Sequence, residues 1–347
     1  MACAQPFGRT PEGARASVYT LENDVLRVRI TDFGGRMVSI EAPDRTGHRD
    51  HVLLGFSEVA EYARNGGSFG ALLGRNANRI ARAELPLEGQ TYRLIPNDRG
   101  NTLHGGPNGF GMLMWKVDAA SDSELMLSHV SPDGDQGFPG EISVAAQYRL
   151  AGNTLSLTIT AHTTGATDAS LSAHPYFNLA GAANGDILGH EVTIAADAFL
   201  PTDASQLPTG EIRSVDGTPF DFRQPAVIGH RIRQNDPQLL RGQGFDHFFV
   251  VDPAKRGQPY FAARLRDPES GRVLEVYTTQ PGTQFYTGNQ LKALFAGHGG
   301  IIYRQSAGLA FEPQGFLDAP HHTNFPSTTL RPADTYRHLL EYRFGTD

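Results

Sequence analysis

Features that direct a chain to a membrane, a nucleic acid or an oxidising compartment are scarce in this sequence. Its 347 residues include one cysteine, Cys3, so an internal disulfide framework is excluded. No stretch approaches the roughly 18 apolar residues of a membrane span, and residues 1–20 contain no apolar signal-peptide core. The net charge is −7 and basic residues do not cluster, so nothing favours nucleic acid. We expect a cytoplasmic protein that binds neither a membrane nor a nucleic acid. A removed export signal is the alternative to a cytoplasmic location.

Helical periodicity is also scarce, and the dominant sequence period is two. Apolar and polar residues alternate in segments 25–30, 142–148 and 155–159, as in half-buried strands. Segments 261–266 and 273–278 flank a turn and predict a hairpin. Short helices are expected at 58–64 and 236–240. No composition shift marks a linker, so the pattern predicts an all-β fold in which residues 1–347 form one large antiparallel β-sandwich.

One carboxylate stands in an unusual setting near the C-terminus. Glu312 follows apolar residues, and Pro313 after it favours extended backbone and cannot donate a strand hydrogen bond. Apolar neighbours at a strand end can raise the pKa of such a carboxylate toward the working range of a general base. A solvated glutamate in a proline-rich loop is the ordinary alternative.

Five further segments carry more polar and aromatic side chains than simple turns need. Sugar hydroxyls are bound by Asn, Gln, Asp, Arg and His, often against an aromatic wall, and two histidines with an acid can transfer protons. Each side chain alone also has a structural explanation, such as a turn cap, an ion pair or a satisfied core histidine. Together they predict a sugar site, and the segments are 74–80, 101–106, 174–179, 244–249 and 280–289.

Metal binding is the competing use of histidine and carboxylate side chains. No HExxH motif occurs, and the adjacent His321 and His322 would point in opposite directions on a strand, so we expect no metal. The glycine pairs at 105–106 and 299–300 lack the spacing of a P-loop or a dinucleotide fingerprint. We therefore expect no cofactor. A serine nucleophile would lack its Gly-x-Ser-x-Gly elbow.

Six motifs, in order and spacing, resemble the aldose 1-epimerase family, the galactose mutarotases. They are GRNANRI, NTLHGG, HPYFNL, GFDHFF, QPGTQFYTGN and FEPQGFLDAP, and the resemblance covers about residues 19–344. It implies a large antiparallel β-sandwich with a sugar cleft on one sheet. It also implies interconversion of the α and β anomers of free aldohexoses such as galactose and glucose, without a cofactor or metal.

The resemblance also implies a role for each candidate residue. Glu312 corresponds to the general base, which takes the proton of the C1 hydroxyl, and His174 to the general acid, which protonates the ring oxygen. Ring opening, rotation about C1–C2 and ring closure would then give the other anomer. The implied substrate-binding residues are Asn78, Arg79, His104, Tyr176, Asp246 and Gln284.

Three other activities stay open at this point. A hexose-6-phosphate epimerase would need extra cations near the phosphate, for which Arg75, Arg79 and Arg82 are available. A non-catalytic sugar-binding module of the same fold would be expected to lack the acid or the base. A glycoside hydrolase would need two carboxylates, and Asp246 with Glu312 is the pair to consider. The sequence does not identify the preferred hexose, and its net charge of −7 is compatible with a monomer or weak dimer.

Overall fold

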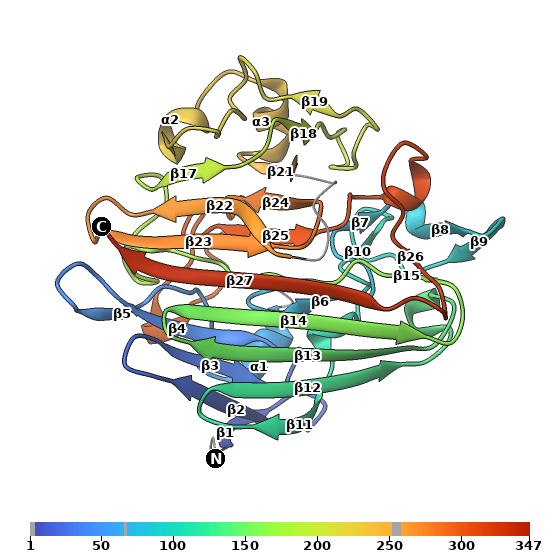
Figure 1. Ribbon diagram of the computed structural model, residues 1–347, viewed down its shortest axis with the longest axis horizontal. Helices are drawn as coiled ribbons and strands as arrows, with labels where there is room; N and C mark the ends of the chain where they lie inside the picture. Colours follow the sequence, from blue (N-terminus) through green and yellow to red (C-terminus); the bar gives the residue numbers. More distant parts are fainter. Residues whose placement is uncertain (1–3, 66–67, 252–257) are drawn as a thin grey trace.

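The computed structural model describes residues 4–65, 68–251 and 258–347, so Cys3 lies outside the described residues. Its largest element is a nine-stranded antiparallel sheet that crosses the whole molecule (Figure 1). In spatial order its strands are β11 (Lys116–Ala120), β12 (Glu124–Ser131), β13 (Ile142–Ala151), β14 (Thr154–Thr163), β27 (Tyr336–Thr346), β23 (Arg272–Thr278), β22 (Tyr260–Arg266), β17 (Glu191–Ile194) and β20 (Ala226–Val227).

The alternating sequence pattern accounts for these long strands. Along β13 and β14 buried residues alternate with more exposed ones, because successive side chains of a strand point to opposite faces. The expected hairpin is present as β22 and β23, which pair antiparallel. The last strand, β27, inserts between β14 and β23, so the C-terminal segment joins two distant parts of the chain (Figure 1).

Two five-stranded sheets and four short strand pairs complete the β-structure of the described residues. One sheet contains β1 (Gln5–Arg9), β2 (Arg15–Glu22), β3 (Arg27–Thr31), β4 (Met37–Pro43) and β5 (Arg49–His51). The other contains β19 (Arg213–Ser214), β18 (Ala198–Leu200), β21 (Asp246–Val250), β24 (Gly282–Tyr286) and β25 (Ala310–Gln314). The short pairs are β10 (Thr102–Leu103) with β7 (Arg79–Ile80), β15 (Thr167–Asp168) with β26 (Thr329–Leu330), β16 (Ser172–Ala173) with β6 (Leu72–Leu73), and β8 (Glu84–Leu87) with β9 (Gln90–Arg93).

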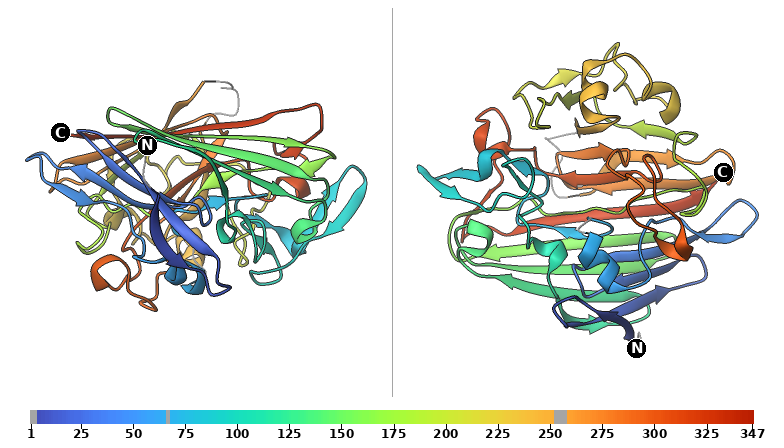
Figure 2. Two further views of the ribbon diagram at one scale, coloured as in Figure 1. Left: turned by 90° about the horizontal axis from the view of Figure 1, so that it is seen from below. Right: turned by 180° about the vertical axis from the view of Figure 1, so that it is seen from behind.

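The sheets share one hydrophobic core. A single cluster of buried side chains begins at Tyr19 and ends at Phe344, and it includes Leu157 of the large sheet and Phe285 of the sheet that contains β24. Seen from the side, the long strands form one layer, and most short strands and helices lie to one side of it (Figure 2). The expected all-β antiparallel sandwich is therefore confirmed.

Helices are few among the described residues. The expected helices are present as α1 (Val59–Asn65) and α3 (Pro237–Gly242), whose N-cap is Asp236, whereas α2 (Ile228–Arg231) was not expected. No helix in the described ranges is long and apolar enough to cross a membrane.

The expectation that His321 and His322 diverge on a strand is wrong. They lie at a short 3₁₀ helix, η5 (Ala319–His321), where Pro320 occupies a first-turn position. There Nδ1 of His321 is 2.6 Å from Asp318 Oδ1, and Nε2 of His322 is 3.8 Å from Asp318 Oδ2. Both imidazoles therefore turn to the same carboxylate.

Candidate active site

Strand register places the expected acidic and amide side chains on one face of the sheet that contains β24. Gln284 on β24 lies opposite Glu312 on β25, and Asp246 on β21 lies diagonally across from Gln284. The intervening residues Phe285 and Phe311 point to the other face, where their rings stack 5.3 Å apart in the core. The period of two thus separates a polar site from an aromatic core.

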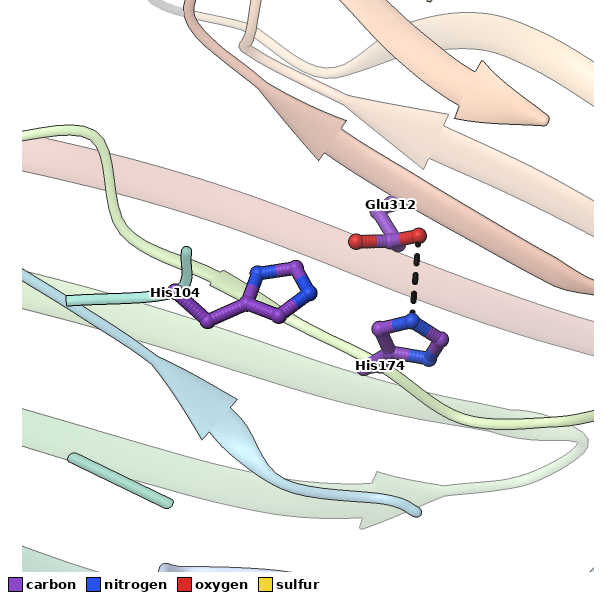
Figure 3. A group of neighbouring side chains, drawn as sticks. All are labelled: His104, His174 and Glu312. Atoms are coloured by element: carbon purple, nitrogen blue, oxygen red, sulfur yellow. Dashed lines mark ion pairs between the residues drawn. The ribbon is translucent and has the colours of Figure 1, made fainter. Parts of the chain in front are cut away.

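His174 reaches Glu312 from a different segment. It follows β16, and Ser172 of that strand donates through Oγ to the carbonyl oxygen of Pro313 at 2.7 Å. Nε2 of His174 lies 3.3 Å from Oε1 of Glu312, and both side chains are almost fully buried. Figure 3 shows the two groups facing each other with the His104 ring beside them.

His104 is held by a reciprocal contact with Asn78. The backbone N–H of Asn78 donates to Nδ1 of His104 at 3.1 Å, and the backbone N–H of His104 donates to the carbonyl oxygen of Asn78 at 2.9 Å. Both residues adopt positive φ, 65° for Asn78 and 52° for His104. Because Nδ1 accepts a hydrogen bond, it carries no proton, and the proton of the neutral ring is on Nε2.

Arg79 is anchored by two residues that the sequence did not identify. Its Nε donates to Asp98 Oδ2 at 2.7 Å, and its Nη2 donates to Gln206 Oε1 at 3.1 Å. Asn78 Oδ1 accepts from the backbone N–H of Arg79 at 3.0 Å. Gln206 lies between β18 and β19, and nothing in the sequence connects it to Arg79.

The remaining candidates complete one cluster. Gln284 Nε2 donates to Asp246 Oδ1 at 2.6 Å. The two side chains therefore form one unit that can hydrogen-bond to hydroxyl groups. The Tyr176 ring packs 4.7 Å from the His174 ring, and the Tyr286 ring lies 6.0 Å from that of Tyr176. Tyr286 is a further residue of this aromatic wall. Its motif, QPGTQFYTGN, was identified in the sequence, but Tyr286 itself was not among the candidates. All eight expected residues lie in this cluster.

Three buried polar atoms in the cluster have no hydrogen-bond partner in the described part of the protein. They are His174 Nδ1, Glu312 Oε2 and Gln284 Oε1. A buried polar atom without a partner is costly, so such atoms are rare in native structures and usually have a functional explanation. Two of the three belong to the expected acid and base. The arrangement fits a polar ligand that supplies the missing partners.

Burial controls the protonation of the acid–base pair. Burial, together with the charge of Asp246, raises the pKa of Glu312, and Arg79 partly offsets this rise. Burial also lowers the pKa of His174. The pair therefore retains one proton over a wide pH range, because gaining a second or losing the last would leave a net charge in a buried site. Burial, His174 and Arg79 together lower the pKa of His104, which keeps this ring neutral.

His104, His174 and Glu312 have the residue types of a metal site. Each offers one ligand atom, and these atoms lie within 4.8 Å of one another. The hydrogen bond from Asn78 argues against a metal, because it leaves the proton of His104 on Nε2. Ligation through Nε2 would require moving that proton to Nδ1, where it would face the N–H of Asn78. The three side chains therefore fit proton transfer and hydrogen bonding better than metal binding.

Comparison with known proteins shows the family to which the chain belongs. The aldose 1-epimerase family model matches residues 17–343. Human galactose mutarotase is 41% identical over 340 residues, covering 98% of this chain and 97% of that protein. Aldose 1-epimerase from Escherichia coli is 35% identical and covers 96% of each chain. The structure of an aldose epimerase homologue from C. elegans superposes with a TM-score of 0.86 at 28% identity, covering 95% of this chain and 99% of that one. The chain belongs to the aldose 1-epimerase family, as its motifs predict.

Proposed function

We propose that this protein is an aldose 1-epimerase that interconverts the α and β anomers of free aldohexoses, galactose and glucose among them. The buried contact of 3.3 Å between His174 and Glu312 is the observation that carries the proposal, because it pairs a proton donor with a proton acceptor. Family membership supports the class of reaction, an isomerisation. No cofactor enters the proposed chemistry.

In the proposed mechanism the single proton of the pair resides on His174 when the sugar is bound. Glu312 takes the proton of the C1 hydroxyl, and His174 gives its proton to the ring oxygen O5 as the C1–O5 bond breaks. The open-chain aldehyde rotates about C1–C2, and reversal of both transfers closes the ring as the other anomer. His104 donates from Nε2 to a sugar oxygen on which negative charge develops.

The other polar residues hold the part of the sugar that does not react. Asp246 and Gln284 act as one hydroxyl-binding unit because they are already hydrogen-bonded to each other. Arg79 and Asn78 supply further polar groups, and Tyr176 forms part of the wall. Their task is to fix the ring carbons while leaving C1 free to rotate, since positioning of the substrate supplies much of the rate gain in a two-proton reaction.

A hexose-6-phosphate is the less favoured substrate. Arg75, one of the three arginines that kept this alternative open, is buried and donates to Ser131 and to the carbonyl oxygens of Pro132 and Gly140. Arg82 is exposed and pairs with Glu84 at 3.3 Å. These guanidinium groups are already engaged with protein partners, whereas a phosphate needs a cation that is free to bind it.

Polarimetry on α-galactose and α-glucose tests the proposal. Positioned acid and base groups each contribute about 10²–10⁴-fold, so Glu312→Gln should lose at least about 10²-fold in kcat with a modest change in KM. Glu275→Gln, on β23 of the large sheet, is the matched control and should be unaffected. Near-normal turnover by Glu312→Gln would refute its role as base. Cleavage of a chromogenic glycoside by the wild type would indicate a hydrolase instead.

Three broader properties are part of the same proposal. Residues 1–347 form a single domain with a core of about 19–344, which the hydrophobic cluster shared between the sheets supports. The protein acts in hexose metabolism in the cytoplasm, and it is a monomer or weak dimer, for which the net charge of −7 gives some support. Size-exclusion chromatography with light scattering tests the oligomeric state.

A further inference from the structure

In the described part of the chain, the Arg79 side chain makes more hydrogen bonds than the side chain of any other expected sugar-binding residue. A guanidinium has five N–H donors in one plane. The Nε donor is used by Asp98 at 2.7 Å, one Nη2 donor by Gln206 at 3.1 Å and one Nη1 donor by Asn78 at 3.5 Å. One N–H on each Nη atom remains for a ligand. Asp98, Asn78 and Gln206 therefore fix the plane of the guanidinium and with it the directions of these two donors.

Gln206 is held in an unusual backbone conformation. It lies at φ 61°, in the left-handed region that side-chain-bearing residues seldom adopt, yet it is buried. The turn that carries it is built on Asp203, whose Oδ1 accepts the backbone N–H groups of Ser205 and Leu207 at 2.8 and 3.0 Å. Strained backbone of this kind tends to persist where a site requires it. The one side-chain hydrogen bond of Gln206 in the described chain is the bond to Arg79.

The turn is also connected to the opposite side of the site. Thr202, which precedes it, exchanges two hydrogen bonds with the Gln238 side chain, at 2.8 and 3.1 Å. Gln238 Oε1 lies 3.1 Å from Nε2 of His247, and Nδ1 of His247 accepts the backbone N–H of Asp246 at 3.1 Å. A continuous polar chain thus fixes the turn relative to Asp246. Gln206 is built into the site rather than attached to its edge.

We propose that Gln206 is a positioning residue for sugar binding, which fixes the guanidinium plane of Arg79 through Oε1 so that the two remaining N–H donors meet one sugar hydroxyl. The inference rests on the proposed function, because it assumes an aldohexose in the site. It predicts that removing the acceptor atom of Gln206 weakens sugar binding and leaves the acid–base step intact. Asp98 acts on the same guanidinium from the other side.

Three variants separate this role from a structural one. Gln206→Met keeps the length of the side chain and removes the acceptor, whereas Gln206→Glu keeps an acceptor for Arg79. Gln243→Met is the matched control, since Gln243 also has a positive φ, 55°, but is exposed and makes no side-chain hydrogen bond in the described part of the chain. Thermal denaturation of all three reports any general loss of stability.

We expect Gln206→Met to raise KM for galactose about tenfold, the effect of one hydrogen bond to a charged group, with kcat within about twofold of the wild type. Gln206→Glu should restore most of the affinity, and Gln243→Met should behave as the wild type. A KM of Gln206→Met within about twofold of the wild-type value would overturn the proposal, as would a loss confined to kcat.

Calorimetric titration of deoxyhexoses, in a Glu312→Gln background that removes turnover, identifies the hydroxyl involved. One deoxy sugar lacks the hydroxyl that Arg79 binds, so its affinity for the Glu312→Gln protein should be low. Adding Gln206→Met should not lower the affinity for this sugar further. An equal loss for every sugar would contradict a positioning role. If the wild type binds aldohexoses without converting their anomers, the proposed function fails while this comparison still tests Gln206. Absence of any aldohexose binding would refute both.

Discussion

The backbone N–H of Asn78 donates to Nδ1 of His104 at 3.1 Å, and this contact determines what the His104 ring can do. With Nδ1 as acceptor and the pKa of the ring lowered by burial, by His174 and by Arg79, the ring is neutral with its proton on Nε2. Nε2 is therefore a donor aimed into the site. In the proposed mechanism His104 therefore stabilises negative charge on a sugar oxygen and does not remove a proton.

Replacement of His104 tests this donor role. His104→Asn keeps an acceptor near Nδ1 but loses the Nε2 donor, and it should lower kcat by about 10²-fold, as for a preorganised donor. His104→Gln places an amide donor near the position of Nε2 and should retain more activity than His104→Asn. The measurement is kcat by polarimetry, with ¹⁵N chemical shifts of the wild-type imidazole to identify the tautomer. Equal activity of the two variants, or a proton found on Nδ1, would contradict the role.

The same tautomer predicts insensitivity to chelators. His104, His174 and Glu312 are close enough to bind a cation together, but His104 can ligate through Nε2 only if the contact with Asn78 is given up. Prolonged dialysis against a strong chelator should therefore leave kcat unchanged, with metal content measured on the same samples. Loss of activity that is restored by adding back one divalent ion would show that a metal takes part.

The pH dependence of kcat should show a broad plateau. The pKa of His174 is lowered from its usual 6.5 and that of Glu312 is raised from 4.5, both mainly by burial. The active pair holds one proton, so activity falls on the acid side when a second proton binds and on the alkaline side when the last one leaves. Burial moves the first event to lower pH and the second to higher pH. We expect constant kcat between about pH 5 and 7.

Polarimetry across this range, corrected for spontaneous mutarotation in each buffer, measures the profile. The fluorescence of Trp115, the single and buried tryptophan, reports whether the fold is intact at each pH. A titration centred between 4.5 and 6.5 in the intact protein would mean that the two groups ionise independently, as they would in water. That outcome would contradict a shared proton in a buried pair.

The sequence predicted those parts of the protein that depend on local pattern. Alternation identified β13, β14 and the β22–β23 hairpin, because one face of each strand must be buried. The motifs of the family identified Glu312, His174 and the six candidate sugar-binding residues, which the structure brings into one cluster. Local pattern does not reveal that β27 inserts between β14 and β23, since that pairing depends on the packing of the whole sheet.

Contacts that depend on tertiary packing could not be predicted from the sequence. Asp98 and Gln206 lie in polar turns, and nothing local distinguishes a turn residue that holds Arg79 from one that faces water. His321 and His322 were expected on a strand, whereas they lie at a 3₁₀ helix that Asp318 precedes and that has Pro320 in its first turn. An Asp two residues before a Pro was the available signal of a helix start.

Ser172 offers a test of how the distance between acid and base is set. Its Oγ donates to the carbonyl oxygen of Pro313 at 2.7 Å, which ties the segment of His174 to the strand of Glu312. Ser172→Ala removes this buried hydrogen bond and should lower the free energy of unfolding by about 1–3 kcal/mol. Because small displacements of reacting groups are costly, kcat should fall about tenfold or more with little change in KM.

Urea denaturation and polarimetry measure the two effects separately. Ser156→Ala is the matched control, because Ser156 lies on β14, is partly exposed and makes a longer bond of 3.3 Å to Arg149. It should change neither quantity by much. Wild-type kcat in a destabilised Ser172→Ala protein would mean that the bond to Pro313 supports the fold but does not hold His174 at its distance from Glu312. The acid–base geometry would then depend on the packing of Tyr176 and Tyr286 against His174.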